Sequence, residues 1–167
     1  MSYDVHFKHA DDVIEHLDTF VPGLEDPLLR AKYVGFVTVA AVTVYEIALK
    51  SVLIDFATSQ NKVFGTFAEA FFGRINGRIR IEDIQKDYLK KFGVDYKTGF
   101  KENLKQAADV YLHAHKRDIV SSYENLITWR NDYAHEGTLN ETATYEEVVQ
   151  AYADGKEVIR CLAGTMK

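Results

Sequence analysis

Three residues that can perform acid–base and phosphate chemistry lie within six positions of one another: Arg130, Asn131 and His135. A histidine can exchange a proton near neutral pH, and an arginine presents a planar fork of donors to phosphate oxygens. Such a set suits cleavage of RNA by attack of a 2′-hydroxyl on the adjacent phosphorus. That reaction requires no metal, and the sequence shows no metal-ligand cluster near these residues.

The spacing of Arg130 and His135 constrains how they act together. On an ideal α-helix, residues five apart are separated by about 140° around the axis and roughly 7.5 Å along it, so a straight helix does not point both at one atom. The pair converges if the helix distorts at its end. It also converges if two copies meet about a twofold axis, where each copy contributes to a shared groove.

Length and composition predict the fold that positions these side chains. The chain has 167 residues, of which 47% are hydrophobic and 13% aromatic, enough to pack an interior at the usual size of one domain. We expect a single domain over residues 1–167. Both prolines, Pro22 and Pro27, lie near the start, which favours long helices downstream. The predicted fold is all-α, an up-and-down bundle of about five to seven helices.

A central helix is predicted over Leu28–Ser59, around the apolar stretch Tyr33–Tyr45. Its β-branched residues also allow a strand, but the apolar character continues to Ala57 without a turn residue, far beyond a typical strand of about 5–6 residues. Charges interrupt the stretch before the roughly 20 apolar residues that a membrane span needs, so we interpret it as a buried core helix. Glu46 within it is expected either to lie near the site or to pair with a cation.

Apolar residues at helical spacing predict the remaining elements. In the first helix the expected apolar stripe is His6, Ala10, Val13, Leu17 and Phe20. The phenylalanines of the next helix, 63–72, are expected in the core. A short charged helix over 79–92 and helices over 100–115 and 119–136 follow. The segment Thr144-Tyr145-Glu146-Glu147 has the form of a capping box and predicts the start of a last helix that runs nearly to Met166.

Charge and cysteine content narrow the choice of partners and compartment. The formal net charge of −5 argues against bulk binding of duplex DNA. A local basic excess still allows contact with a few phosphates; it comprises Arg74, Arg78, Arg80, Lys86, Lys90 and Lys91, diluted by Glu82, Asp83 and Asp87. The single cysteine, Cys161, cannot form an internal disulfide and is expected to be a small core residue. With no secretory signal at its start, the chain is expected to be cytoplasmic.

The segment Arg130-Asn131-Asp132-Tyr133-Ala134-His135 resembles the R-x4-H motif of the HEPN superfamily, including the polar residue directly after the arginine. The flanking Leu126–Trp129 and Glu136-Gly137 are also typical of that motif. The core helix centred on Glu46, the turn at Gly77-Arg78-Ile79, Phe92-Gly93 and the threonine-rich step into the last helix resemble the RiboL-PSP-HEPN branch. The likeness runs from the core helix to the C-terminus.

The resemblance implies a bundle that dimerises through the motif helix and acts as a metal-independent endoribonuclease, in the role of a toxin or an antiviral-defence effector. Arg130 and His135 would be catalytic and Asn131 would support them; Glu46, Asp132 and Tyr133 are further supporting candidates. RNA would be the substrate, and a second copy and an antitoxin or other protein the partners, with no cofactor or metal. Members paired with a nucleotidyltransferase antitoxin often carry a tyrosine two places after the histidine, where this chain has Gly137.

Structural alternatives remain open at this point. Arg130 can be a surface arginine without a role in catalysis. His135 can be a histidine in the last helical turn before Gly137, where a positive charge interacts favourably with the helix dipole. Trp129 can pack in the core or stack on a base. The histidines of the first helix, His6, His9 and His16, are expected on an exposed polar face rather than around a metal. The alternative function is a non-catalytic HEPN adaptor, or a module that binds a nucleotide or a protein.

Overall fold

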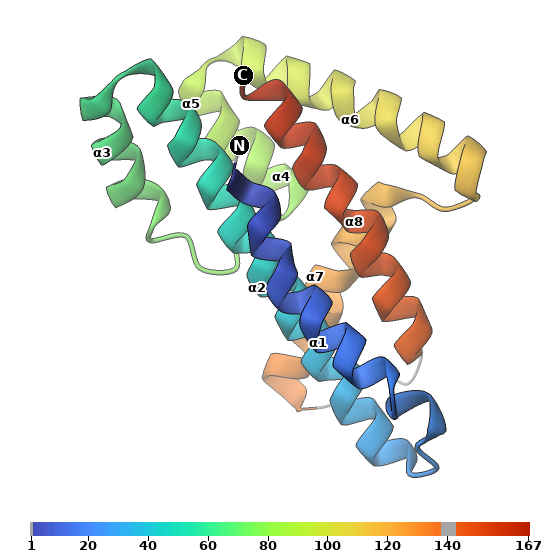
Figure 1. The fold of residues 1–167 in the computed structure, drawn as a ribbon. Helices are drawn as coiled ribbons and strands as arrows, with labels where there is room; N and C mark the ends of the chain where they lie inside the picture. The colour runs from blue at the N-terminus through green and yellow to red at the C-terminus, as the bar shows by residue number, and fades with distance from the viewer. Residues whose placement is uncertain (1, 138–142) are drawn as a thin grey trace.

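A computed structural model describes residues 2–137 and 143–167 of the chain (Figure 1). Its helices are α1 (Lys8–Asp18), α2 (Pro27–Gln60), α3 (Lys62–Phe72), α4 (Ile81–Asp83), α5 (Lys90–Phe92), α6 (Val94–His115), α7 (Ile119–Glu136) and α8 (Tyr145–Thr165). Short 3-10 turns cover Ser2–Phe7 and Val21–Gly23, and a π-helical turn, Ile84–Leu89, joins α4 to α5. With 81–92 counted as one segment, the described chain has seven helices and no strand, which confirms the predicted all-α bundle.

Helix α2 is the centre of the bundle and contacts α1, α3, α7 and α8. Figure 1 shows α1 and α8 running beside α2, while α6 lies across one end of the bundle. Helices α7 and α8 pack on each other as well as on α2, and α6 packs on α8. The motif helix α7 is therefore packed against two long helices, α2 and α8.

Capping residues mark both ends of helix α2. The Asp26 side chain accepts hydrogen bonds from the backbone N–H groups of Leu28 and Leu29, and Pro27 occupies the first helical position, where its missing N–H costs nothing. At the other end Asn61 caps α3 by accepting from the Val63 N–H at 2.8 Å. The prediction of a helix over Leu28–Ser59 is confirmed, and the strand alternative is wrong.

The apolar character of α2 reflects burial in this fold. Its most apolar window is long and apolar enough to cross a membrane, with a mean hydropathy of 1.8, but 61% of that window is buried inside the molecule. Tertiary packing thus outweighs the modest helix propensity of its many valines and threonines. The interpretation as a core helix agrees with this burial.

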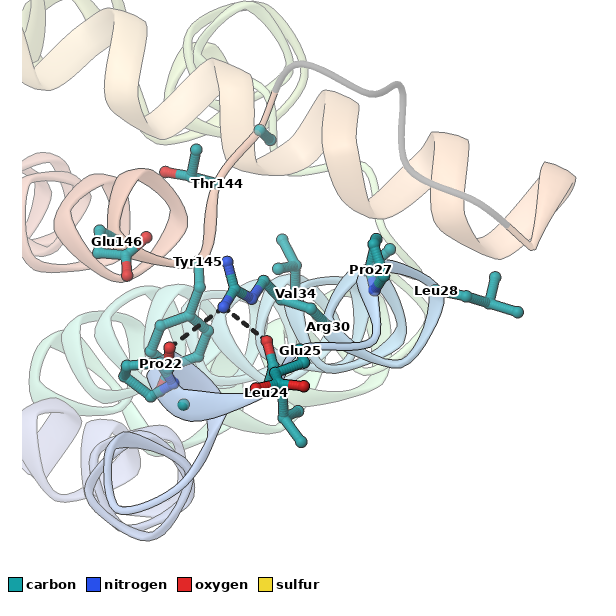
Figure 2. Close-up of a pocket in the computed structure, with 13 residues that line it drawn as sticks. Pro22, Leu24, Glu25, Pro27, Leu28, Arg30, Val34, Thr144, Tyr145 and Glu146 are labelled. Atoms are coloured by element: carbon teal, nitrogen blue, oxygen red, sulfur yellow. Dashed lines mark hydrogen bonds between the residues drawn. The ribbon is translucent and has the colours of Figure 1, made fainter.

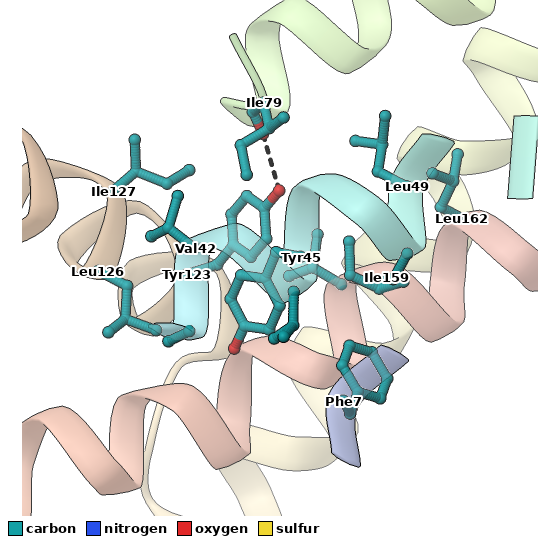
Figure 3. Packing of buried hydrophobic residues seen from close by; sticks show 14 of the residues in the cluster. Phe7, Val42, Tyr45, Leu49, Ile79, Tyr123, Leu126, Ile127, Ile159 and Leu162 are labelled. Atoms are coloured by element: carbon teal, nitrogen blue, oxygen red, sulfur yellow. Dashed lines mark hydrogen bonds between the residues drawn. The ribbon is translucent and has the colours of Figure 1, made fainter. Parts of the chain in front are cut away.

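Three stacked tyrosines join α2, α7 and α8 in the core, and Figure 3 shows two of them, Tyr45 and Tyr123. The Tyr45 ring stacks on Tyr123 and on Tyr152, with ring centroids 5.2 and 5.7 Å apart. The Tyr45 hydroxyl donates to the Tyr152 carbonyl at 2.5 Å, and the Tyr123 hydroxyl donates to the Ile79 carbonyl at 2.7 Å. Burial raises the pKa of Tyr45 and Tyr123 well above the usual value, so both stay neutral donors. Gly155 lets α8 approach, because a Cβ there would meet the Tyr45 hydroxyl.

A buried carboxylate ties α6, α7 and α8 together. Asp154 is 0% exposed and accepts hydrogen bonds from the Arg117 guanidinium, the Tyr111 hydroxyl, Ser122 Oγ and the Gln150 amide. Burial opposes ionisation, but the hydrogen bonds from Arg117, Tyr111 and Gln150 prevail and lower the pKa of Asp154. The ionised carboxylate therefore acts as a polar crosslink between three helices.

The structure corrects two predicted apolar faces. In the first helix the buried residues are Ala10, Ile14 and Leu17, so the inward stripe is centred on Ile14 rather than Val13. In α3 only Phe72 among the phenylalanines is buried, whereas Phe64, Phe67 and Phe71 are 37%, 66% and 37% exposed. The reason is that α3 packs on α2 through small residues: a Cβ at Gly65 would collide with Thr58. The close approach of the two helices turns the phenylalanines outward.

The other predicted elements are confirmed within a few residues. The capping box forms as expected, with the Glu147 N–H donating to Thr144 Oγ1 at 3.1 Å and the Thr144 N–H donating to the Glu147 carboxylate at 2.8 Å. The helix predicted over 100–115 begins earlier, at Val94. Cys161 is half-buried at the edge of the core. Most of the threonine-rich step before α8, residues 138–142, lies outside the described residues.

Candidate functional site

The motif occupies the last two turns of α7. The helix continues through Glu136, and Gly137 follows with a left-handed φ of 69°. The Gly137 N–H donates to the Tyr133 carbonyl at 3.0 Å, which closes the last turn. The predicted end of the helix at Gly137 is confirmed. Because α7 is regular over Ile119–Glu136, the ideal separation of about 140° between Arg130 and His135 applies to it.

Arg130 faces inward, into a shallow groove between α2 and the turn before α4. The groove has a volume of about 310 Å³ and is lined by Val39, Val42, Thr43, Glu46, Asn76, Gly77 and Arg130. The guanidinium lies directly against the backbone of Gly77: a Cβ there would be 2.7 Å from Nη2 of Arg130. Gly77 also has a φ of 69°, so both its conformation and its contact favour glycine.

Glu46 fixes the turn that covers Arg130. One carboxylate oxygen accepts from the Gly77 N–H at 2.6 Å, and the other accepts from Lys50 Nζ at 2.7 Å. Its side chain is 20% exposed and its charge is compensated by Lys50. Both expectations for Glu46 therefore hold together, since it lines the groove and pairs with a cation. In this arrangement Glu46 positions the backbone of Gly77 against Arg130.

The other motif residues point elsewhere. The Tyr133 ring lies flat against Gly35 of α2, where a Cβ would collide with it, so Tyr133 locks α7 onto α2. Asn131 and Asp132 are half-buried, and His135 is exposed. Among the described residues that line the groove, Arg130 is the only one that belongs to α7. Within one chain the structure brings Arg130 and Glu46 together and leaves His135 on a different face.

The sequence did not predict three hydrogen bonds that lie near the motif. Arg80 donates to the Glu124 carboxylate at 2.7 Å and to Thr128 Oγ1 at 3.1 Å, and the Ile81 N–H donates to Glu124 at 2.8 Å. These bonds fix the start of α4 to α7, one turn before the motif. Trp129 is partly buried against the core, as its packing interpretation requires. Partners more than 40 residues apart leave no spacing signal in a single sequence.

A second hollow, shown in Figure 2, shares no lining residue with the Arg130 groove. It measures about 1050 Å³ and opens between the turn at Pro22–Glu25, the start of α2 and the residues that lead into α8. Arg30, which lines this hollow, donates to the carbonyls of Pro22 and Leu24 at 3.1 and 2.7 Å and so fixes the turn before α2. Among the described residues that line it, this hollow has no set of titratable groups comparable to the motif.

Across residues 2–137 and 143–167, no three His, Cys, Asp or Glu side chains are grouped as a metal ion would require. In α1, His9 and His16 are exposed and His6 is half-buried. His16 packs edge-on against Phe20, with ring centroids 5.7 Å apart. The candidate site consists of an arginine held in a groove and an exposed histidine at the end of the same helix.

An all-α bundle with an R-x4-H motif at the end of a core-packed helix is the arrangement of a HEPN-type module. The family model for RiboL-PSP-HEPN matches residues 6–167, essentially the whole chain, and the protein belongs to this family. Neither the curated proteins nor the solved structures contain a significant match to the chain. The match begins at residue 6, so it includes α1 as well as the segments that carry the resemblance.

Proposed function

We propose that the protein is a metal-independent endoribonuclease of the HEPN type, folded as one domain over residues 1–167. The observation that carries this proposal is the placement of Arg130, whose guanidinium is held in a groove against Gly77 on the same helix that ends with an exposed His135. Membership of the RiboL-PSP-HEPN family supports the same interpretation. Asn131, four residues before His135, shares its face and is the proposed supporting residue.

The proposed reaction uses only these side chains. His135 takes the proton from a ribose 2′-hydroxyl, the 2′-oxygen forms a bond to phosphorus, and the bond from phosphorus to the 5′-oxygen breaks. Arg130 donates hydrogen bonds to the phosphoryl oxygens, where negative charge develops in the transition state. The leaving 5′-oxygen takes a proton from the imidazolium or from water. The products carry a 2′,3′-cyclic phosphate and a 5′-hydroxyl.

The proposed active form is a homodimer in which Arg130 of one copy meets His135 of the other. A regular α7 keeps the two side chains of one copy about 140° apart, so the alternative of a distorted helix end receives no support. Beside the groove, α2 exposes two large apolar side chains, Phe36 at 49% and Ile47 at 43%, with Thr43 between them on the same face. Such a face next to a half-assembled site suits a twofold contact.

We propose an RNA-degrading toxin or antiviral-defence effector as the biological role, with an antitoxin or other protein as the regulatory partner. Gly137 replaces the tyrosine expected for neutralisation by adenylylation, so control by direct protein binding fits better. The alternative is a non-catalytic HEPN adaptor, for which the same exposed face of α2 would bind a partner. The nuclease and the adaptor would both use the exposed face of α2 for a protein contact, and they differ in whether the protein cuts RNA.

Incubation of the purified chain with mixed RNA in excess chelator tests the proposal. We expect wild type to leave 2′,3′-cyclic phosphate ends, His135→Ala to leave RNA intact, and the matched control His9→Ala, an exposed histidine on α1, to cut normally. Arg130→Ala should slow cleavage about 100- to 1000-fold, the usual cost of losing one oxyanion donor. Activity that disappears in chelator and returns with magnesium would contradict the mechanism. A folded wild type that cuts no RNA would favour the adaptor.

A further inference from the structure

A chain of hollows leads from the Arg130 groove to the exposed phenylalanines of α3. Asn76 lines both the groove and a neighbouring hollow of about 580 Å³, which is also lined by Arg74, Arg78 and Tyr88. Phe71 and Lys91 line this hollow and also a small cleft of about 60 Å³ that includes Phe64, Phe67 and Phe92. Neighbouring hollows thus share lining residues, and we call the surface that they line the aromatic–basic track (Phe64, Phe67, Phe71, Arg74, Asn76, Arg78 and Lys91).

Most rings at the aromatic end of the track pack on one another, and Phe67 is the most exposed of the track's phenylalanines. Phe92 stacks on Phe72, with centroids 5.7 Å apart and planes 4° apart, and packs edge-on against Phe64. Phe71 packs edge-on against Phe72 at 5.1 Å. Phe67 is 66% exposed and contacts no other ring in the described part of the chain. Phe67 therefore leaves most of its surface open to solvent.

The middle of the track carries excess positive charge. Arg78 is ion-paired with Asp83 and Asp87, so it is partly neutralised. Arg74 and Lys91 are exposed, and neither has an ion-pair partner among residues 2–137 and 143–167. Lys91 Nζ lies 5.1 Å from the centroid of the Phe71 ring, which places a cation beside an aromatic face. This local charge contrasts with the net charge of −5 for the whole chain.

We propose that the aromatic–basic track binds single-stranded RNA that extends from the scissile phosphate at Arg130, with Phe67 stacking on a base and Arg74 and Lys91 contacting phosphates. The inference rests on the proposed function. An aromatic surface next to a group of cations fits unpaired nucleotides, since an unstacked base offers a flat face and each nucleotide a phosphate. Two uncompensated cations are too few to hold a duplex firmly, which favours a single strand.

Binding of RNA that cannot be cut separates this inference from catalysis. A short, mixed-sequence, fluorescein-labelled 2′-O-methyl oligoribonucleotide lacks the attacking hydroxyl, so its fluorescence anisotropy reports binding alone. We expect Phe67→Ala to raise Kd about 5- to 100-fold with an unchanged salt dependence, because stacking is lost and no phosphate contact is. Phe67→Trp should restore affinity and Phe67→Leu should not, since only tryptophan keeps a flat ring.

The cation variants should behave differently from the aromatic ones. Arg74→Ala should reduce the slope of log affinity against log salt concentration by about 0.7, the value for one phosphate contact to a single strand. Matched controls are Lys105→Ala and Val110→Ala, both exposed on α6, which should bind the oligonucleotide as wild type does. Circular dichroism melts of each variant confirm that the fold is retained.

The outcomes distinguish the two proposals. If wild type binds the 2′-O-methyl RNA through Phe67 and Arg74 but cuts no RNA, the catalytic proposal fails and the track stands. If the chain cuts RNA but Phe67→Ala and Arg74→Ala bind with wild-type affinity, the track is wrong. If Phe67→Ala leaves RNA binding unchanged and instead dissociates a dimer, the phenylalanines form a protein interface and the inference is overturned.

Discussion

The two halves of α7 differ in what they contact. In the first half Ile119, Tyr123, Leu126 and Ile127 are buried in the core, whereas no residue from Thr128 to Gly137 is fully buried. The first half is fixed by tyrosine stacking and by the hydrogen bond from Ser122 to Asp154. The second half carries the motif. The fully buried residues of α7 thus lie in its first half, while the second half holds the residues proposed to act on RNA together with Tyr133, which packs on α2. We expect substitutions of the buried residues in the first half and of Arg130 or His135 in the second half to have separable effects.

Leu126→Ala should have the largest effect on stability. Leu126 is 0% exposed, so its truncation removes buried apolar surface and leaves a cavity, at a cost of about 2–5 kcal/mol in the free energy of unfolding. Urea or thermal unfolding measures the loss. An unchanged melting temperature would show that the first half of α7 does not anchor the helix. It would contradict the claim that the two halves differ in their contribution to stability.

Arg117→Ala should come next, because it removes a major donor to the buried Asp154 carboxylate. The expected loss is about 1–3 kcal/mol at neutral pH, tempered by the remaining bonds from Tyr111, Ser122 and Gln150. Since the pKa of Asp154 is lowered in the fold, the stability that its ionised form contributes is present at neutral pH and is lost as the pH falls below about 4.

The difference in stability between wild type and Arg117→Ala should therefore shrink on acidification. Unfolding curves at a series of pH values from neutral to acidic test this. A difference that stays constant, or grows, as the pH falls would mean that the ion pair is not the source of the effect.

Gly77→Ala should have a smaller effect on stability and a clear effect on the site. A left-handed residue other than glycine costs about 1 kcal/mol, and the new Cβ would lie 2.7 Å from Arg130 Nη2, so the guanidinium must shift. We expect slower RNA cleavage with the fold retained. The matched control is Gly164→Ala, where nothing lies within 4 Å of the added Cβ. Equal cleavage by the two variants would show that the Gly77 contact does not position Arg130.

His135→Ala should have the smallest effect on stability, within roughly 0.5 kcal/mol, because the side chain is exposed. Differential scanning calorimetry of the variant beside wild type gives the comparison. If His135→Ala unfolds the protein, His135 is a structural residue and the outer half of α7 is not separate from the core.

The sequence predicts elements best where local chemistry defines their ends. The start of α8 follows from the capping box at Thr144, and the bounds predicted for α2 lie within one residue of those that the structure shows between the caps Asp26 and Asn61. These signals involve residues within a few positions of one another. The motif helix is similar, since its end coincides with Gly137.

Contacts between distant segments are not predicted in this way. The pairing of Arg117 with Asp154 and the contact of Gly77 with Arg130 depend on how helices pack, which no spacing encodes. The outward phenylalanines of α3 have a related origin. Helical periodicity identifies a stripe that includes Phe67 and Phe71, but the small residues Gly65 and Ala68 determine which face lies on α2. Composition alone favours burial of the larger side chains.

Mixing two inactive variants tests most directly whether the site is shared between two copies. Arg130→Ala and His135→Ala each lack one proposed catalytic group, but a mixed dimer retains one site with Arg130 from one copy and His135 from the other. After the subunits exchange in equal amounts, we expect about a quarter of wild-type RNA cleavage, since about half of the dimers are mixed and each has one of two sites intact. No recovery, in a mixture shown to have exchanged subunits, would contradict a site built from two copies.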